Sequence, residues 1–547
     1  MTRSGAPAVA SAGLVLLTLA SGQFLMTLDS SVMNVSIATV AEDVGTTVTG
    51  IQAAITLYML VMATMMIAGG KVGSMIGRRR AFSLGCVIYG VGSLTTALAP
   101  NVTVLYIGWS GLEGLGAALI LPAIVALVAT NFPPEGRPRA YGLVMAAAAV
   151  AVATGPLIGG FMTTYLSWRY VFAGEVVIVL AILVLGRRIH DAPSGDEADF
   201  DVVGAVLWAL GLGAGVFAVL QSGAWGWVSP SPDAPAILGV SLVTWLLIAS
   251  AVIILAFVAW QRRRDAAGRE PLIRLSMFEN GQLRGGLTRF FFLYLVQAGA
   301  FFVMPLFLSV ALGLSAFETG VRLLPLSVAV VLAAMLIPKL RPGASARRVS
   351  QAGMVAIAVG IIVLIGALEV GVGAEVVTGP FILIGLGIGA LASQLGAVTV
   401  SSMPDSLSGE VGGLQNTVTN LGAALGTALA GSVLIAILTS SFLTGVQQNP
   451  DVPASVSSQA EVQLSGGAPF VSDAQLETSL QEAGVPPATA DAVLSENEEA
   501  RIDALRSSLL LLALFSLVGI LFARRIPDAP AGGAVDAPAE GAARAPA

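Results

Sequence analysis

The residues of this chain that could do chemistry are acidic side chains inside long apolar segments. Asp29, Glu113 and Glu175 each stand within a run of apolar residues. An aspartate at the centre of a bilayer costs about 2.5–3.5 kcal/mol on insertion scales, so such a residue is by default a functional candidate. We interpret Asp29 as a proton- or cation-binding carboxylate. The alternative is an aspartate near the outer interface of a membrane, hydrogen-bonded to Asn34 or to a neighbouring hydroxyl.

Glu113 is predicted to lie at the same depth as Asp29. Each stands about ten residues from the outer end of its apolar run, which at about 1.5 Å per residue is about 15 Å deep. Two carboxylates at one depth without a buried base retain at least one proton between them. Glu113 could instead face a neighbouring helix, protonated and inert. Glu175 lies about two turns into its run, where an interfacial glutamate and a cavity residue are equally good interpretations.

Other polar residues add little catalytic potential. Gln297 and Gln394 are polar exceptions in the C-terminal half and could line a cavity. The chain has one cysteine, Cys86, and one histidine, His190, so it can form no intrachain disulfide and shows no metal-binding cluster. It has no phosphate-binding glycine loop followed by lysine and no pairing of a nucleophile with a base. We therefore predict no metal, no cofactor and no enzymatic activity.

The composition is that of a membrane protein. Of 547 residues, 56% are hydrophobic and 11% charged, whereas soluble domains carry about 25% charged residues. This excludes a soluble multidomain protein, a disordered chain and a nucleic-acid binder. Runs of about 20 apolar residues predict membrane helices, and fourteen occur: 13–39, 50–70, 81–99, 103–130, 140–164, 169–187, 203–222, 236–260, 286–313, 318–339, 350–370, 376–402, 411–440 and 504–523. The first run is too long for the apolar part of a signal peptide and is interpreted as an uncleaved helix. The predicted fold is an all-α polytopic membrane protein with fourteen transmembrane helices.

The basic residues predict the orientation. With the N-terminus inside and fourteen crossings, 23 of the 27 basic residues fall at inner segments, as the positive-inside rule requires. Both termini are then cytoplasmic. The four exceptions are Arg169, Arg322, Arg501 and Arg506.

Three connections are long. Residues 188–202 and 261–285 are inner, the first an acidic linker. Residues 443–503 are outer and hold ten acids and one base. We predict short helices there, one of them capped by Asp473 and closed by Gly484, and a further helix that opens at Pro486-Pro487 and runs into the last apolar run. The tail 526–547 is rich in Ala, Pro and Gly and is predicted to be disordered.

Four segments resemble motifs of the major facilitator superfamily, specifically its fourteen-helix drug/proton antiporter branch. They are Leu28-Asp29-Ser30-Ser31-Val32-Met33-Asn34-Val35, the segment Gly69–Arg80, Gly155-Pro156-Leu157-Ile158-Gly159-Gly160, and Gly409-Glu410-Val411-Gly412-Gly413-Leu414-Gln415-Asn416-Thr417. The resemblance implies an N-terminal six-helix bundle (1–187), a C-terminal six-helix bundle (286–525) and, between them (188–285), a linker, an extra helix pair and an inner loop. It implies a gating loop at Gly70, Gly73, Gly77, Arg78 and Arg79. It also implies a bend and seal at the antiporter motif Gly155, Pro156, Gly159 and Gly160.

The chain departs from the family pattern at four positions. Ser74 stands where the family's loop motif has an aspartate, and Ser110 stands where its fourth helix has an arginine. Glu113 replaces a glutamine and Glu175 an asparagine. A charge pair typical of the family is therefore absent, and two unusual carboxylates are present.

The resemblance implies a secondary transporter in a bacterial plasma membrane. It would export lipophilic small molecules, including cationic ones, in exchange for protons by alternating access. Its partners would be small-molecule substrates, protons and membrane lipids, and no nucleic acid. Two alternatives stay open: an exporter dedicated to one lipid or secondary metabolite, and a membrane scaffold or sensor that has kept the fold and lost transport.

Overall fold

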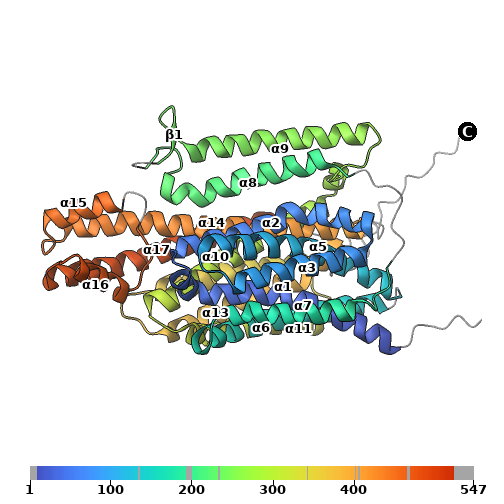
Figure 1. Ribbon diagram of the computed structural model, residues 1–547, viewed down its shortest axis with the longest axis horizontal. Helices are drawn as coiled ribbons and strands as arrows, with labels where there is room; N and C mark the ends of the chain where they lie inside the picture. Colours follow the sequence, from blue (N-terminus) through green and yellow to red (C-terminus); the bar gives the residue numbers. More distant parts are fainter. Residues whose placement is uncertain are drawn as a thin grey trace, which may run out of the picture.

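The computed structural model describes residues 9–133, 136–191, 200–231, 234–341, 343–400, 402–403, 407–464 and 468–522. The predicted disordered tail and most of the predicted linker 188–202 lie outside these residues. Within them the protein is helical, with one two-stranded ribbon. Long helices lie side by side along one direction, as a transmembrane bundle requires (Figure 1).

The N-terminal half is built from seven helices and one π-helical segment. They are α1 (Val9–Asp43), α2 (Val48–Ile76), α3 (Arg78–Ala97), α4 (Val102–Leu105), η1 (Tyr106–Glu113), α5 (Gly114–Asn131), α6 (Arg137–Tyr165) and α7 (Arg169–Gly186). Helix α4, η1 and α5 form one continuous element over the predicted run 103–130. Side-chain caps set the starts: Thr47 accepts from the Gly50 amide at 3.3 Å before α2, and Asn101 accepts from the Val104 amide at 3.1 Å before α4.

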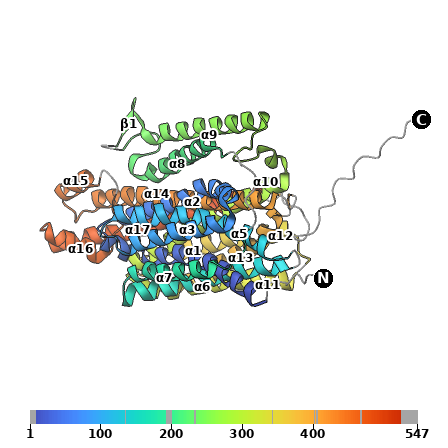
Figure 2. The same ribbon diagram turned by 45° about the vertical axis from the view of Figure 1, so that its right-hand side comes forward.

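Two helices form a hairpin outside the bundle, α8 (Val202–Trp225) and α9 (Leu242–Ala266). Both views show it along one side of the bundle (Figures 1 and 2). Helix α8 packs on α2 and α14, whereas α9 packs on α8. The predicted helix start at residue 236 is wrong, because β1 (Ala236–Ile237) and β2 (Val240–Ser241) pair antiparallel there. Leu238 and Gly239 form their turn with φ of 54° and 75°, which interrupts helical geometry.

A buried carboxylate joins the start of α8 to the end of α9. Asp201 caps α8 by accepting from the Gly204 amide at 2.9 Å, and it accepts from Trp260 at 2.8 Å and Gln261 at 2.7 Å on α9. Arg264 lies 3.8 Å away. Burial raises the pKa of Asp201, but these hydrogen bonds and the charge of Arg264 outweigh it and hold the pKa below its ordinary value.

The C-terminal half is also helical and carries an extension. Its elements are η3 (Leu275–Glu279), α10 (Gly281–Leu306), η4 (Phe307–Ala311), α11 (Ala316–Leu340), α12 (Ala346–Ala367), η5 (Ala374–Val377), α13 (Thr378–Val400), α14 (Ser408–Gln448), α15 (Ala454–Gln463), α16 (Asp473–Glu482) and α17 (Pro487–Leu521). Thirteen helices within the described residues are long and apolar enough to cross a membrane. Helix α3, which begins with Arg78-Arg79-Arg80 and covers the predicted run 81–99, is not among them.

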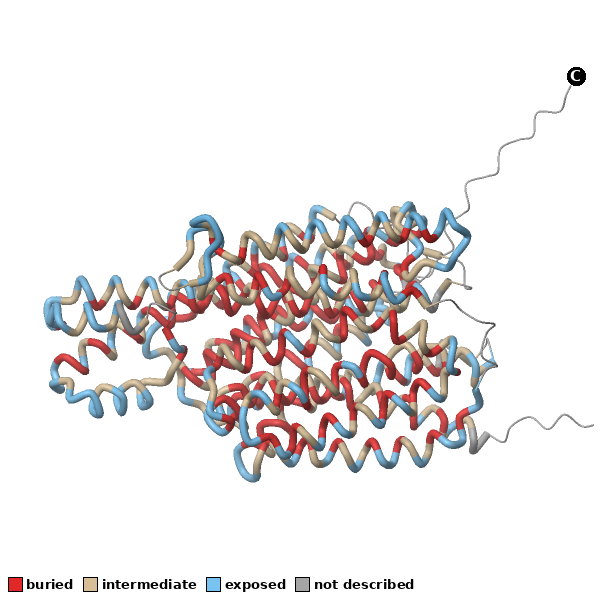
Figure 3. The backbone as a smooth tube through the Cα atoms, turned by 45° about the horizontal axis from the view of Figure 1, so that its top comes forward, coloured by how far each residue is buried: buried red, intermediate tan, exposed pale blue. Residues whose placement is uncertain are grey.

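The extension confirms that the long acidic segment contains short helices. Helices α15 and α16 lie beyond the bundle with the ends of α14 and α17 (Figure 1), and exposed residues dominate there while buried ones fill the bundle (Figure 3). The predicted cap is wrong. Ser472, not Asp473, caps α16, because its hydroxyl and the Gln475 side chain close a reciprocal capping box. Asp473 is the first helical residue and pairs with Arg501.

Candidate functional site: a buried carboxyl cluster

Three acidic side chains from distant parts of the sequence meet inside the N-terminal half. Asp29 comes from α1, Glu113 from η1 and Glu175 from α7, and one carboxylate oxygen of each lies within 4.8 Å of the others. Asp29 and Glu113 are fully buried and Glu175 is 1% exposed. The structure therefore brings together the predicted pair and adds Glu175 to it, in the protein interior.

Local backbone structure makes this approach possible. Glu113 ends the π-helical segment η1, and such segments re-aim side chains within a helix. Gly92 on α3 lies directly against it. A Cβ at Gly92 would fall 2.6 Å from Glu113 Cγ and 2.8 Å from its backbone nitrogen. Only a glycine at position 92 lets α3 and η1 come this close.

Neutral donors point at the carboxylates. The Trp109 indole donates to both oxygens of Asp29, at 2.8 and 3.1 Å. The Trp109 ring stacks on Tyr58 with centroids 5.2 Å apart and planes 7° apart. The stack therefore fixes the direction of the indole donor.

Each of the two glutamates accepts hydrogen bonds on only one of its carboxylate oxygens. Tyr89 donates to Glu175 Oε2 at 3.2 Å and Ser93 donates to the same atom at 3.1 Å. Thr96 donates to Glu113 Oε1 at 3.0 Å. The other oxygens, Glu113 Oε2 and Glu175 Oε1, are buried without a hydrogen-bond partner among the described residues. Each is a place where a proton can sit.

Like charge is the dominant electrostatic feature of the cluster. The donors to the three carboxyls are all neutral side chains. Within the described part of the chain, no lysine, arginine or histidine forms an ion pair or hydrogen bond with them. At 4.8 Å and an effective dielectric constant of about 20, two unit charges repel by about 3.5 kcal/mol. Three ionised carboxyls would suffer that repulsion three times, which favours proton binding by the cluster. An indole N–H cannot ligate a cation, and Trp109 already occupies both oxygens of Asp29 that a metal ion would need.

The other predicted polar residues lie elsewhere. Asn34 donates to the Ser30 carbonyl at 2.9 Å, not to Asp29, and lines a small cavity of about 20 Å³ between α1, α6, α10 and α11, which is room for about one water molecule. Gln297 lies half-buried on α10. Gln394 is buried on α13 and donates to Ser393 at 3.1 Å.

The predicted gating loop is a tight turn between α2 and α3. Gly77 joins them with φ of +99°, a conformation that favours glycine. Arg78 reaches back and donates to the Gly70 carbonyl at 3.1 Å. The Arg79 amide donates to Asp191 at 3.1 Å, and a Cβ at Gly77 would fall 2.7 Å from the same carboxylate. Asp191 thus brings an acidic group to a loop in which Ser74 replaces the usual aspartate. No signal in the local sequence indicates that Asp191 lies beside this loop.

The predicted antiporter motif is a contact surface on α6. A Cβ at Gly155 would meet Ser31 of α1 at 2.5 Å, and one at Gly159 would meet Val32 at 2.9 Å. Gly160 faces the other half of the protein, where a Cβ would fall 2.8 Å from Phe317 Cα on α11. Helix α6 stays continuous through Pro156.

A second seam joins the halves at α2 and α14. Gln52 on α2 is buried and donates to the carbonyls of Thr427 and Ala428 on α14, at 3.1 and 3.3 Å. It lies against Gly431, where no side chain intervenes. Gln52 is not among the residues predicted from the sequence, although a glutamine inside an apolar run was the available signal.

Comparisons with known proteins identify relatives across most of the chain. The model of the Major Facilitator Superfamily matches residues 19–427. The chain is 29% identical over 425 residues to the tetracenomycin C resistance and export protein of Streptomyces glaucescens, which covers 77% of this chain and 75% of the relative. It is 26% identical over 524 residues to the multidrug efflux pump LfrA of Mycolicibacterium smegmatis, with 94% and 97% covered.

A solved structure shares the fold. The crystal structure of a bacterial homologue of the human lysosomal transporter Spinster, in an inward-facing and unoccupied conformation, matches with a TM-score of 0.60 at 16% identity. The match covers 95% of this chain and 98% of that chain. At this identity the likeness concerns the fold alone.

Proposed function

The chain belongs to the major facilitator superfamily, and on that basis we propose that it exports lipophilic small molecules, including cationic ones, in exchange for protons. It is a multi-pass membrane protein with bacterial relatives. Two relatives named for export or efflux support the direction of transport. The membrane would be the bacterial plasma membrane.

The observation that carries the proposal is the cluster of Asp29, Glu113 and Glu175. Its carboxyls repel one another by several kcal/mol unless protons are bound, so it is a proton store inside the membrane. When the protein opens outward, protons from the external water would bind to the carboxyl cluster. A cationic substrate that arrives from the inner side favours the ionised form, because an opposite charge stabilises a carboxylate. Proton and substrate then compete for the same charge, which is sufficient for exchange.

The architecture supports alternating access. We propose that α3 is a fourteenth span, so that residues 1–187 and 286–525 form two six-helix bundles and α8 and α9 the extra pair. The termini would then be cytoplasmic, in agreement with the 23 basic residues at inner segments. The seams at Gly160 and Gln52 would close the outer end, and the bundles would rock about a substrate cavity between them, with the carboxyl cluster inside the N-terminal bundle.

Proteoliposomes test the coupling. Growth of overexpressing cells on a panel of toxic compounds first selects a transported probe, with ethidium as the initial choice. Asp29→Asn and Glu113→Gln should each abolish export driven by a pH gradient and the proton release that the probe causes in detergent. Glu42→Gln is the matched control, since Glu42 is an exposed acid at the end of α1.

Two results would reject this mechanism. One is parental transport and proton release in each of Asp29→Asn, Glu113→Gln and Glu175→Gln. The other is export that follows a sodium gradient without a pH gradient, because the coupling ion would then not be a proton. A normally inserted protein that transports no compound of the panel would favour the scaffold or sensor.

A further inference from the structure

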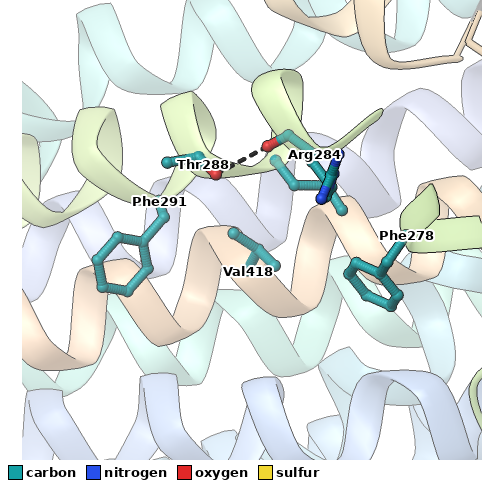
Figure 4. A pocket seen from close by; sticks show the side chains of 6 residues that line it. Phe278, Arg284, Thr288, Phe291 and Val418 are labelled. Atoms are coloured by element: carbon teal, nitrogen blue, oxygen red, sulfur yellow. Dashed lines mark hydrogen bonds between the residues drawn. The ribbon is translucent and has the colours of Figure 1, made fainter. Parts of the chain in front are cut away.

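A groove between α10 and α14 combines one positive charge with apolar walls. Its cavity of about 390 Å³ is lined by Phe278, Arg284, Leu287, Thr288, Phe291 and Val418. The four α10 residues follow an i, i+3, i+4, i+7 spacing and so share one face of the helix. Phe278 comes from η3 and Val418 from α14 (Figure 4).

Among the polar groups of this groove, the Arg284 guanidinium has free hydrogen-bond donors. The Thr288 hydroxyl already donates to the Arg284 carbonyl at 2.7 Å (Figure 4). The Arg284 side chain is exposed, and its guanidinium has no ion pair or hydrogen bond with the described residues. By contrast, nearby Arg274 lies 3.3 Å from Glu410, and Lys71 pairs with Glu270.

The order of charge and apolar surface along the groove matches a membrane lipid. Arg284 lies in the first turn of α10, at the end that the basic residues assign to the inner membrane face. Phe291 lies seven residues further, about 10 Å deeper at 1.5 Å per residue. The exposed Arg262, Arg263 and Arg269 stand near the same face and add to its positive field. A guanidinium matches the oxygens of a phosphate in geometry and charge.

We propose that this groove binds an anionic phospholipid of the inner leaflet. The phosphate contacts Arg284, and one acyl chain runs along Leu287 and Val418 to Phe291 (Figure 4). A free phosphate does not fit equally well, because the other walls provide no donors. The site is separate from the carboxyl cluster and does not require the protein to be a transporter.

Native mass spectrometry of the full-length protein tests this directly. Phosphatidylglycerol and phosphatidylcholine with identical chains are the two probes. The parent should retain phosphatidylglycerol in preference to phosphatidylcholine. Arg284→Gln should weaken phosphatidylglycerol binding at least about tenfold, because a hydrogen bond to a charged group is lost. Arg262→Gln is the matched control, an exposed arginine of the same face that lies outside the groove, and should weaken binding much less than Arg284→Gln because only a contribution to the field is lost.

A second variant tests the apolar walls. Phe291→Ala should weaken the binding of phosphatidylglycerol while its preference over phosphatidylcholine persists. Unchanged thermal unfolding of both variants shows that they are folded. The proposal is overturned if Arg284→Gln retains phosphatidylglycerol like the parent, or if the parent binds both lipids equally. Displacement by millimolar inorganic phosphate would show a phosphate site, and displacement by ethidium would show a substrate site; either result also overturns it.

Discussion

Replacing Gly160 by alanine should force the two halves of the protein apart where α6 meets α11. The new Cβ would lie 2.8 Å from Phe317 Cα and 2.9 Å from the Ala316 carbonyl carbon. Both are backbone atoms at the start of α11, so no side-chain rotation relieves the clash. Ordinary carbon contacts lie at about 3.5–4.0 Å, and the helices must therefore separate by several tenths of an ångström or more.

The energetic effect follows from the cost of overpacking. An extra methyl group in a packed contact costs about 1–3 kcal/mol. In the proposed transport cycle, the contact between Gly160 and the start of α11 exists only while the two halves are closed at this seam. Since about 1.36 kcal/mol is a tenfold change, the equilibrium should shift toward the open state about 5- to 160-fold. The gain in helix propensity from Gly to Ala applies to both states and cancels.

Thiol labelling measures this shift. A single cysteine replaces Ser31, which lines the small cavity next to Asn34 and Pro156, in a Cys86→Ser background. In intact cells, Gly160→Ala should raise the rate at which this cysteine reacts with an impermeant reagent, by up to about 160-fold. Gly142→Ala is the control, because it lies on the same helix and a Cβ there would meet nothing within 4 Å. An unchanged rate in Gly160→Ala, or an equal rise in the control, would refute the closed seam.

Two further predictions concern buried charges. Arg289 on α10 is fully buried, and its three guanidinium nitrogens have no partner among the described residues. Arg501 instead donates to the Val471 carbonyl and pairs with Asp473. In thermal unfolding, Arg289→Met should stabilise the protein by about 1–4 kcal/mol and Arg501→Met should destabilise it by about 1–3 kcal/mol; stability changes of the same sign in both variants would contradict this. The pKa of Asp201 lies below its ordinary value, so its stabilisation is present above about pH 4 and is lost as pH falls through the folded-state pKa. Asp201→Asn should therefore lower the unfolding temperature at pH 6–7 and reduce its acid dependence below pH 4, and a parallel pH profile would contradict the assignment.

Much of the fold is encoded locally and could be predicted. Runs of about 20 apolar residues become helices in a membrane because backbone amides have no other partner there. The burial of Asp29 and Glu113 followed from their positions within such runs. The helical character of the acidic extension and the start of α17 at Pro487 followed from capping and turn residues. The cap of α16 was misplaced by one residue, because serine and aspartate cap equally well and only the reciprocal bond with Gln475 distinguishes them.

The assembly of the site was decided by tertiary structure. A helix that is apolar on every side carries no signal for which face turns inward. For that reason the sequence by itself placed Asp29 and Glu113 at one depth but did not bring Glu175 to them. It could not identify the indole of Trp109 as the donor to Asp29, or Asp191 as the acid beside Gly77. These contacts depend on the rotation and tilt of whole helices, which packing between glycine-lined surfaces sets across the bundle.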